Sequence, residues 1–377
     1  MPEYNIQMVD LKSQYDKIKD QVDEAILSVI DSTAFIKGPE VTEFKRELQE
    51  YLSVKHVIPC GNGTDALQIA LMALGLKPGD EVITADFTFA ATVEVIGLLN
   101  LTPVFVDVDR DTFNINVEAL EKAITSKTKA IIPVHLFGQC ANMEAVMAIA
   151  KTHNLFVVED TAQAIGADYS FSNGDVKKAG TIGNIGTTSF FPSKNLGCYG
   201  DGGALFTNDD ELGKRLAAIV NHGMYQRYYH DEIGVNSRLD SIQAAILRIK
   251  LPHLDNYSAS RKKAAEYYNN AFAGIDQIET PVTDQQSTHV FHQYTLKLKG
   301  VDRNKLQEYL KERGIPSMIY YPVPLHQQKA YVRPEFKDED YPVTMELCGS
   351  VISLPMHTEL DEKQLKYITE SVKEFFK

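Results

Sequence analysis

Short apolar runs that alternate with helical patterns are the feature that most restricts how this chain of 377 residues can fold. The runs are rich in β-branched and aromatic residues, as strands are, and their apolar residues occupy successive positions, so both faces must be buried. Strands of this kind, separated by helices, form a mostly parallel sheet that helices cover on both sides. The predicted strands are 56–60, 80–85, 102–108, 128–136, 155–160, 187–191 and 203–207. The predicted helices between them are 65–75, 91–100, 116–124 and 142–153.

The pattern changes near residue 250, where long charged helical segments replace the alternation. This change predicts two domains, a large α/β domain at 1–250 and a smaller α+β domain at 251–377. The N-terminal helices are expected to pack on the small domain, because the two ends of a chain often meet.

The charge balance and the cysteines restrict the kinds of partner. The net charge is −13, which argues against binding to nucleic acid or to an anionic membrane, so an anionic ligand needs local basic groups or backbone amides. Cys60, Cys140, Cys198 and Cys348 are scattered and form no CxxC pair, so we expect reduced thiols. The longest apolar stretch, 66–76, is too short to span a membrane, and the N-terminus shows no secretory signal. These features predict a soluble cytoplasmic protein.

A glycine-rich turn, CGNGT at 60–64, joins a predicted strand to a predicted helix. The first N–H groups of a helix have no partner inside it and carry positive dipole character, and glycine lets an anion approach them. Gly63 and Thr64 are therefore candidates for binding a phosphate group. The alternative is an ordinary helix start, in which Thr64 or Asp65 caps the helix.

A second candidate is the acidic end of the strand at 155–160. Glu159 and Asp160 lie where this strand ends, and open α/β sheets bind ligands beside the carboxyl ends of their strands. One carboxylate there can cap a helix, bind a metal, or hold a proton on the ring nitrogen of a cofactor. His135, His153 and His222 follow no spacing typical of metal ligands, so no metal site is predicted.

Lys194 lies in a third segment, TSFFPSKNLGCYGDGGA at 188–204. A Walker-type lysine requires GxxxxG before it and a dinucleotide-binding turn requires GxGxxG before a helix, and the segment has neither. A lysine, an acid at a strand end and a phosphate-binding turn are the three parts that pyridoxal 5′-phosphate requires. The amine forms a Schiff base with the aldehyde, the acid keeps the ring nitrogen protonated, and the helix start holds the phosphate.

Nearly the whole chain resembles the DegT/DnrJ/EryC1/StrS family of nucleotide-sugar aminotransferases. The segments that carry the resemblance are NGTDALQ at 62–68, VVEDTAQ at 157–163, SFFPSKNLGCYGDGGA at 189–204 and GVNSRLDSIQAAIL at 234–247. The resemblance implies a fold type I transferase, similar to aspartate aminotransferase, that forms a homodimer with shared active sites. It also implies that Lys194 is the Schiff-base lysine and that Asp160 is the partner of the pyridine nitrogen.

The resemblance assigns further residues to the cofactor and the substrate. Gln163 would hydrogen-bond the ring oxygen of the cofactor, and Phe89 would stack on its ring, unless Phe89 is simply a core residue. Arg238 would reach across the dimer to a sugar carboxylate, which suits a planar guanidinium; a salt bridge to Asp240 or Glu232 is the alternative. The phosphate would be held by Gly63, Thr64, Ser189 and Asn236 of the partner subunit.

The segment MIYYPVPLHQQ at 318–328 is similar to a family stretch that covers the sugar and favours amination at C3. Tyr320 stands where relatives have histidine, whereas Tyr321 and His326 match the family pattern, and all three are expected to contact the substrate. The resemblance implies that glutamate donates an amino group, becoming 2-oxoglutarate, to the C3 keto group of a nucleotide-linked sugar. A UDP-linked 2-acetamido-2-deoxy-3-oxo-uronate is the preferred acceptor, and surface polysaccharide synthesis is the expected context.

Ping-pong transamination is the expected mechanism, with Lys194 as the proton carrier. A dTDP-3-keto-6-deoxyhexose 3-aminotransferase and a nucleotide-sugar 4-aminotransferase share every cofactor motif and stay open as alternatives. A non-catalytic regulator that binds pyridoxal phosphate is a third, although no basic DNA-recognition helix is visible. Dehydratases of the family replace the lysine with histidine, so Lys194 argues against dehydration.

Overall fold

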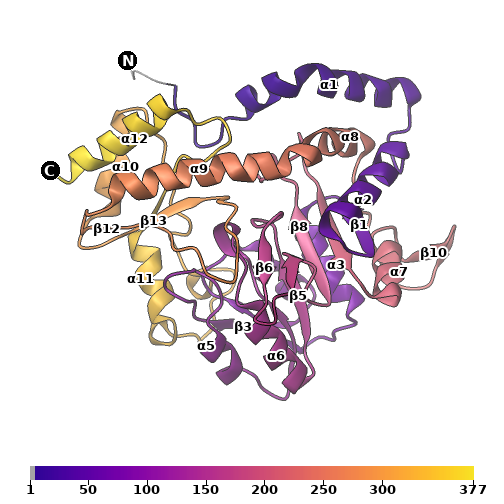
Figure 1. The fold of residues 1–377 in the computed structure, drawn as a ribbon. Coiled ribbons are helices and arrows are strands. Elements are labelled where there is room, and N and C mark those ends of the chain that lie inside the picture. The colour runs from indigo at the N-terminus through magenta and orange to yellow at the C-terminus, as the bar shows by residue number, and fades with distance from the viewer. Residues whose placement is uncertain (1–4) are drawn as a thin grey trace.

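The computed structural model describes residues 5–377, and its largest element is a seven-stranded sheet (Figure 1). The strands are β1 (His56–Cys60), β2 (Glu81–Ala85), β3 (Thr102–Val106), β4 (Thr128–Ile132), β5 (Phe156–Asp160), β8 (Ile185–Ser189) and β9 (Gly203–Thr207). Their order is β1-β9-β8-β5-β4-β2-β3, and the neighbours are parallel except for β9, which is antiparallel to β1 and β8. Every predicted strand is present, with some ends shifted by a few residues, so the mostly parallel α/β fold is confirmed.

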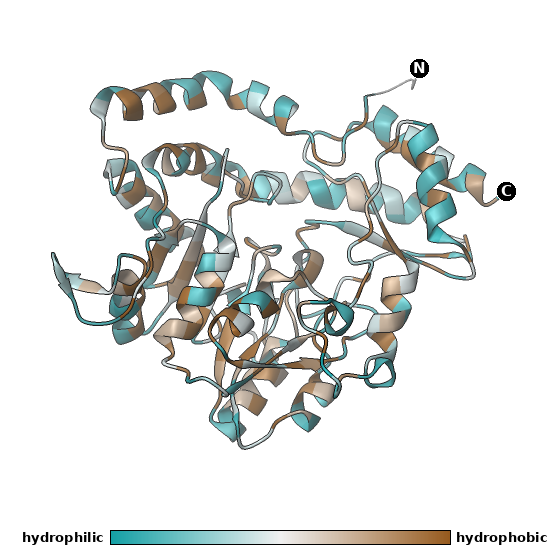
Figure 2. Ribbon diagram, turned by 180° about the vertical axis from the view of Figure 1, so that it is seen from behind, coloured by the Kyte–Doolittle hydropathy of each residue, from teal (hydrophilic) through white to brown (hydrophobic). Residues whose placement is uncertain are grey.

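Helices cover both faces of this sheet, because adjacent residues of a strand point to opposite sides. Ile83 and Val157 belong to the core on one face, together with residues of α5 and α6. Val82 and Val158 belong to the core on the other face, together with residues of α3, α4 and α7. The helices are α3 (Gly63–Ala73), α4 (Ala91–Leu98), α5 (Val117–Lys122), α6 (Met143–His153) and α7 (Asp210–Ile219). Figure 2 shows the hydrophobic residues concentrated on the central strands and on the helix faces against them.

The N-terminal helices contact both parts of the molecule. The N-terminal helices are α1 (Leu11–Ser32) and α2 (Pro39–Leu52), and both lie against α8 (Ser241–Lys250). α1 packs on α8 through Val22 and Ile246, and α2 packs on α8 as well. The expected contact with the small domain occurs at the start of α1, where the Gln14 side chain donates a hydrogen bond of 3.3 Å to the Thr358 hydroxyl. Most of the N-terminal packing is therefore on the large domain.

The C-terminal part of the chain has a core of its own, which includes Tyr268, Leu296, Ile352 and Ile368. It is built on a three-stranded antiparallel sheet. The elements are α9 (Leu254–Phe272), β12 (Ile278–Glu279), β13 (Tyr294–Leu298), α10 (Arg303–Glu312), α11 (Pro342–Ser350), β14 (Val351–Leu354) and α12 (Glu362–Phe375). The short 3-10 helix η2 (Leu251–His253) joins α8 to α9 directly, so the predicted boundary near residue 250 falls inside a helical run and stays a prediction.

Two hairpins lie outside the main sheets, and the β10 strand projects from the body of the molecule in Figure 1. The remaining elements are β6 (Asp168–Ser170), β7 (Val176–Lys178), β10 (Met224–Gln226), β11 (Tyr229–His230), η1 (Leu136–Gly138), η3 (Leu325–Gln327) and η4 (Asp338–Asp340). The arm formed by 224–233 exposes four large apolar side chains, Tyr225, Tyr228, Tyr229 and Ile233. Within residues 5–377, no helix combines the length and apolar character needed to cross a membrane.

Candidate active site

The three candidate segments meet at one edge of the large sheet. β1 and β8 are each antiparallel to β9, and β5 is parallel to β8, so β1, β5 and β8 point the same way. The turn after Cys60, the acid Asp160 and the loop after Ser189 therefore leave from the same edge. The loop 190–202, which carries Lys194, leads into the antiparallel β9 and has to turn back at this edge.

The start of α3 differs from the predicted helix start in one detail. Asn62 caps the helix, and neither Thr64 nor Asp65 does: the Asn62 side-chain oxygen accepts a hydrogen bond of 2.8 Å from the Asp65 N–H. The N–H groups of Gly63 and Thr64 have no hydrogen-bond partner within residues 5–377. A Cβ at Gly63 would lie 2.7 Å from the Cβ of Ser189, so only glycine lets the helix start approach the end of β8 so closely.

Asp160 is held in a fixed orientation at the end of β5. Its carboxylate is buried and accepts hydrogen bonds from the Thr92 hydroxyl at 2.9 Å and from the Ala162 N–H at 3.1 Å. Its backbone pairs with the segment after β4, where its N–H donates to the Pro133 carbonyl and its carbonyl accepts from the His135 N–H, both at 3.0 Å. A partner for a ring nitrogen needs such a fixed direction, since reorientation during the reaction costs free energy.

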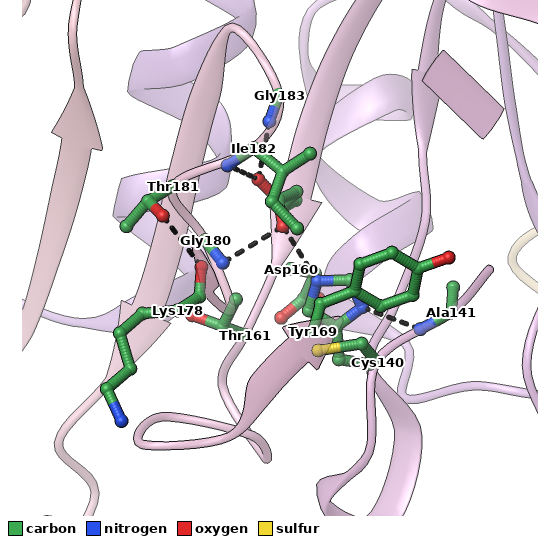
Figure 3. Close-up of polar contacts among 12 residues, drawn as sticks. Cys140, Ala141, Asp160, Thr161, Tyr169, Lys178, Gly180, Thr181, Ile182 and Gly183 are labelled. Atoms are coloured by element: carbon green, nitrogen blue, oxygen red, sulfur yellow. Dashed lines mark hydrogen bonds and ion pairs between the residues drawn. The ribbon is translucent and has the colours of Figure 1, made fainter. Parts of the chain in front are cut away.

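Glu159, the neighbour of Asp160, has a structural role that the sequence did not reveal. Its fully buried carboxylate accepts hydrogen bonds from the backbone N–H groups of Gly180, Ile182 and Gly183 at 2.6–2.9 Å, and Figure 3 labels these three donor residues. Glu159 therefore closes the turn that leads into β8, and it does not cap a helix.

A buried histidine supplies the fourth hydrogen bond to this carboxylate. His135 Nε2 lies 2.9 Å from a Glu159 oxygen. The Ala141 N–H donates to His135 Nδ1 at 3.1 Å, so Nδ1 is the acceptor and Nε2 is the nitrogen that donates to Glu159. The acid that precedes Asp160 is thus fully bonded, which fixes the strand end behind the candidate cofactor site.

Replacing Glu159 with glutamine is expected to lower the free energy of unfolding by about 3 kcal/mol. Each carboxylate oxygen accepts two hydrogen bonds, so the amide nitrogen that replaces one oxygen faces two donors. Urea unfolding measures the change, with Glu118→Gln, an exposed acid on α5, as the matched control. The control should change stability by less than about 0.5 kcal/mol. Equal stability of the Glu159→Gln and wild-type proteins would contradict the structural role.

Lys194 is half-buried, and the charge of Asp160 acts on its amine. Burial lowers the pKa of Lys194 to about 8, and the Asp160 carboxylate opposes part of that shift. A pKa of about 8 leaves about 10% of the amine unprotonated at pH 7, against about 0.04% for an ordinary lysine. Because only the unprotonated amine is a nucleophile, this environment prepares Lys194 for covalent bond formation.

Two side chains of α8 anchor the loop that carries Lys194, and the sequence analysis missed both. The buried ammonium of Lys250 donates a hydrogen bond of 2.6 Å to the Gly197 carbonyl. The Tyr199 N–H donates to the Gln243 side-chain oxygen at 2.9 Å. Burial also lowers the pKa of Lys250 to about 8. The position of this lysine among buried apolar residues of α8 is the sequence signal that could have revealed it, since lysine is almost never fully buried without a partner.

Phe89, Gln163 and Tyr321 come together beside the same edge. The Phe89 side chain is 58% exposed, so the alternative that it belongs to the core is wrong. Its ring centroid lies 6.4 Å from that of Tyr321, whose hydroxyl accepts a hydrogen bond of 3.1 Å from Gln163 Nε2. The Gln163 oxygen accepts from the Phe137 N–H at 2.8 Å. Both contacts fix the Gln163 amide, which keeps a second N–H to donate.

His326 is held by two carboxylates, and its predicted contact with the substrate stays a prediction. It is buried, and its Nδ1 and Nε2 lie 2.6 Å from Asp86 and 3.0 Å from Asp338, respectively. These carboxylates occupy both ring nitrogens, so His326 joins the 318–328 segment to the residues after β2. Tyr320 is half-buried, with its ring centroid 5.9 Å from that of Tyr321.

Arg238 has no carboxylate partner within residues 5–377. Its guanidinium donates a hydrogen bond of 3.3 Å to the Asn221 side-chain oxygen. Glu232 is bound by another arginine at 2.9 Å, and Asp240 forms no ion pair with Arg238, so the predicted salt-bridge alternative is wrong. Asn236 is exposed and pairs with Asn221 only through its backbone. Both Asn236 and Arg238 can therefore bind a ligand or a second subunit.

Sequence comparison decides the family. The profile of the DegT/DnrJ/EryC1/StrS aminotransferase family matches residues 16–373, which is nearly the whole described chain. The chain belongs to this family. It is therefore a sugar aminotransferase that depends on pyridoxal phosphate, as predicted.

Three relatives align with this family member over almost its full length. It is 48% identical to the "Pleiotropic regulatory protein" of Geobacillus stearothermophilus, over 99% of each chain. It is 46% identical to the UDP-2-acetamido-2-deoxy-3-oxo-D-glucuronate aminotransferase of Pseudomonas aeruginosa, over 96% of this chain and 98% of that protein. It is 44% identical to a UDP-N-acetyl-3-dehydro-alpha-D-glucosamine 3-aminotransferase of Acidithiobacillus ferrooxidans, over 96% of each chain.

Solved structures share the fold. S. venezuelae DesV in complex with a ketimine intermediate superposes with a TM-score of 0.94 at 38% identity, covering 100% of this chain and 99% of that one. The ntda protein of Bacillus subtilis, solved with bound cofactor PMP, has a TM-score of 0.88 at 29% identity, covering 98% of this chain and 83% of that one.

The residues of this aminotransferase fit its cofactor. Lys194 offers an amine with a lowered pKa, and Asp160 offers a buried carboxylate of fixed direction. The unbonded N–H groups at the start of α3 lie beside Ser189, where an anionic group can be held. All three features lie at one sheet edge, as the cofactor requires.

Proposed function

We propose that this aminotransferase moves an amino group from glutamate to the C3 keto group of UDP-2-acetamido-2-deoxy-3-oxo-D-glucuronate. The 46% identity to the Pseudomonas aeruginosa enzyme named for that sugar supports the proposal. The observation that carries it is the guanidinium of Arg238, which has no carboxylate partner within the described chain. A uronate supplies that partner, because a carboxylate matches the planar fork of arginine through two parallel hydrogen bonds. The reaction is proposed to take place in the cytoplasm, in the synthesis of a surface polysaccharide.

A homodimer with shared active sites is part of the proposal. The arm at 224–233 exposes large apolar side chains, which is typical of a surface that contacts another protein. Asn236 and Arg238 follow this arm directly, so an arm that contacts a second copy brings both residues to the dimer interface. Each site is then completed by Asn236 of the partner subunit at the phosphate and by Arg238 of the partner subunit at the sugar.

When bound, pyridoxal 5′-phosphate supplies an aldehyde that forms imines with amines and a ring that accepts the electrons freed at the substrate carbon. Lys194 would hold the cofactor covalently, and its amine would carry the proton that leaves the substrate carbon. A pKa of about 8 suits this work, because the amine both gains and loses a proton readily near neutral pH. Asp160 holds a proton at the ring nitrogen, with its direction fixed by Thr92 and Ala162.

The other residues of the site are proposed to bind and orient the cofactor and the sugar. The start of α3, with Gly63 and Thr64, holds the phosphate together with the Ser189 hydroxyl. Phe89 would offer an exposed ring to the cofactor, and the free N–H of Gln163 would donate a hydrogen bond to it. Tyr321 lies beside Phe89 and Tyr320 lies beside Tyr321, and the two tyrosines would bound the space for the sugar.

Other acceptors use the same cofactor chemistry. A dTDP-linked neutral sugar, or amination at C4, remains the alternative, but a neutral acceptor leaves Arg238 without a partner. The name of the Geobacillus stearothermophilus relative points to regulation as a second role. A regulator that binds the cofactor would also need a Schiff-base lysine, so Lys194 does not separate the two roles; the aminotransferase names of the other relatives favour catalysis.

Replacing Arg238 with methionine is expected to raise KM for the UDP-linked amino-uronate by about 10–100-fold, because hydrogen bonds to charged groups are worth about 1.5–3 kcal/mol. The measurement is the reverse reaction with 2-oxoglutarate, run over a panel of UDP-, dTDP- and GDP-linked amino sugars. Arg46→Met, at an exposed arginine of α2, is the control and should leave every KM unchanged. A neutral sugar that reacts with a higher kcat/KM than the uronate would refute the proposed acceptor.

A further inference from the structure

The loop between α1 and α2 lies against the start of α8. Ile36 and Asp240 form an antiparallel bridge, and the Gly38 N–H donates a hydrogen bond of 3.2 Å to the Ser241 hydroxyl. This second contact joins positions 203 residues apart in the sequence. The two contacts flank Lys37, so they hold this lysine next to the segment that carries Arg238.

Lys37 and Arg238 form a pair of cations without an anion. Neither has an ion-pair partner within residues 5–377, although the chain has 51 acidic residues against 38 lysines and arginines. Partial burial and the charge of Arg238 lower the pKa of Lys37. Both side chains keep exposed surface, so a bound anion can reach them and relieve their mutual repulsion.

The backbone of Lys37 also points to a functional position. Its φ is +54°, in the left-handed region that residues other than glycine adopt uncommonly. A Cβ at the following residue, Gly38, would lie 2.4 Å from the Ala34 carbonyl oxygen, so the turn is tightly closed. The loop thus holds a lysine in an unfavourable conformation, beside a second cation.

The segment that carries Arg238 is joined to the turn of the candidate phosphate site. Ser237, the residue before Arg238, accepts through its hydroxyl a hydrogen bond of 2.9 Å from the Gly61 N–H. Gly61 belongs to the turn that leads into α3, where Gly63 and Thr64 have unbonded N–H groups. The segment that carries Arg238 is therefore joined to the turn that offers the phosphate site, and in the proposed dimer both cations serve the site of the partner subunit.

We propose that Lys37 and Arg238 together form one oxyanion-binding site for the nucleotide sugar. Lys37 supplies a mobile point charge beside the planar fork of Arg238, so the two can bind different oxygens of one anionic group. The group is either the carboxylate of the uronate or the diphosphate of the nucleotide. The inference rests on the proposed function only in taking a nucleotide sugar as the ligand, and it makes Lys37 a specificity-determining residue.

The test is calorimetric titration of the full-length holoenzyme with two ligands that differ only at C6, UDP-2-acetamido-2-deoxy-glucuronate and UDP-N-acetylglucosamine. Lys37→Met is expected to weaken binding of at least one ligand by about 10-fold, whereas Lys37→Arg, which keeps the charge, should stay within about threefold. The control is Lys363→Met, an exposed lysine of α12. Thermal unfolding should show that all these variants fold like the wild type.

The ligand that loses affinity identifies the anionic group. A loss confined to the uronate supports a carboxylate site, and an equal loss for both ligands supports a diphosphate site. Losses no larger than those of Lys363→Met for both ligands would overturn the proposal. So would strict additivity in the double variant Lys37→Met/Arg238→Met, because two groups that share one anion are energetically coupled. If neutral sugars prove the better substrates while both ligands still lose affinity in Lys37→Met, the oxyanion site stands and the proposed acceptor fails.

Discussion

Replacing Lys194 with alanine is expected to lower kcat for amino transfer by at least about 10⁴-fold, because one amine serves as both the covalent attachment point and the proton carrier. The purified variant should also lose the visible absorption of the lysine-bound cofactor. Its fold should persist, since the substitution removes an amine that burial already disfavours in its charged form.

Single-turnover reaction with glutamate, together with absorption spectra, measures the effect of Lys194→Ala. Lys363→Ala, at the exposed lysine of α12, should keep both the spectrum and the rate. Lys250→Met is a sharper comparison, because burial lowers the pKa of Lys250 to about 8 as well. The ammonium of Lys250 is bonded to the Gly197 carbonyl, so this variant should keep the absorption of the lysine-bound cofactor. An unchanged spectrum in Lys194→Ala would show that the covalent bond to the cofactor forms elsewhere.

Replacing Asp160 with asparagine is expected to lower kcat by about 10²–10³-fold, as the loss of one preorganised electrostatic group does in other enzymes. The asparagine oxygen can still accept a hydrogen bond from the Ala162 N–H, and its amide can donate to the Thr92 hydroxyl, so the strand end should keep its shape. Without the negative charge, the ring nitrogen no longer keeps its proton, and the electron sink weakens.

Both half-reactions should slow together in Asp160→Asn, which rapid mixing with glutamate and with the amino sugar can measure. The control is Thr92→Val, which removes one hydrogen bond to the carboxylate but keeps the charge, so it should cost less than about tenfold. The pKa of Lys194 in the cofactor-free protein should also fall further, because the Asp160 carboxylate opposes part of the shift that burial causes. A kcat for Asp160→Asn within twofold of the wild type would show that Asp160 has no catalytic role.

The groups that surround Glu159 and Asp160 explain why these adjacent acids of one strand have different roles. Adjacent side chains of a strand point to opposite faces of the sheet. Glu159 is surrounded by four hydrogen-bond donors and has no capacity left for a ligand. Asp160 receives two, from Thr92 and Ala162, and acts on the amine of Lys194. The difference between the two acids lies in what surrounds them.

The sequence alone determined the mostly parallel sheet and the three chemical parts of the site. Both conclusions depend on local patterns. Strands buried on both faces have to be apolar at successive positions, and the pattern locates the strand that Asp160 ends and the strands that precede Gly63 and Lys194. The order of these parts along the chain was enough to predict pyridoxal phosphate.

Only the tertiary structure decided which polar side chains are bonded to other groups of the protein and which are free to bind a ligand. His326 is buried against Asp86, 240 positions away in the sequence. Lys250 anchors the loop of Lys194 from another helix, and Lys37 reaches the segment of Arg238 through contacts 203 positions apart. Whether a charged group is free to bind a ligand depends on which groups lie around it in space, and folding brings those groups together from distant parts of the chain.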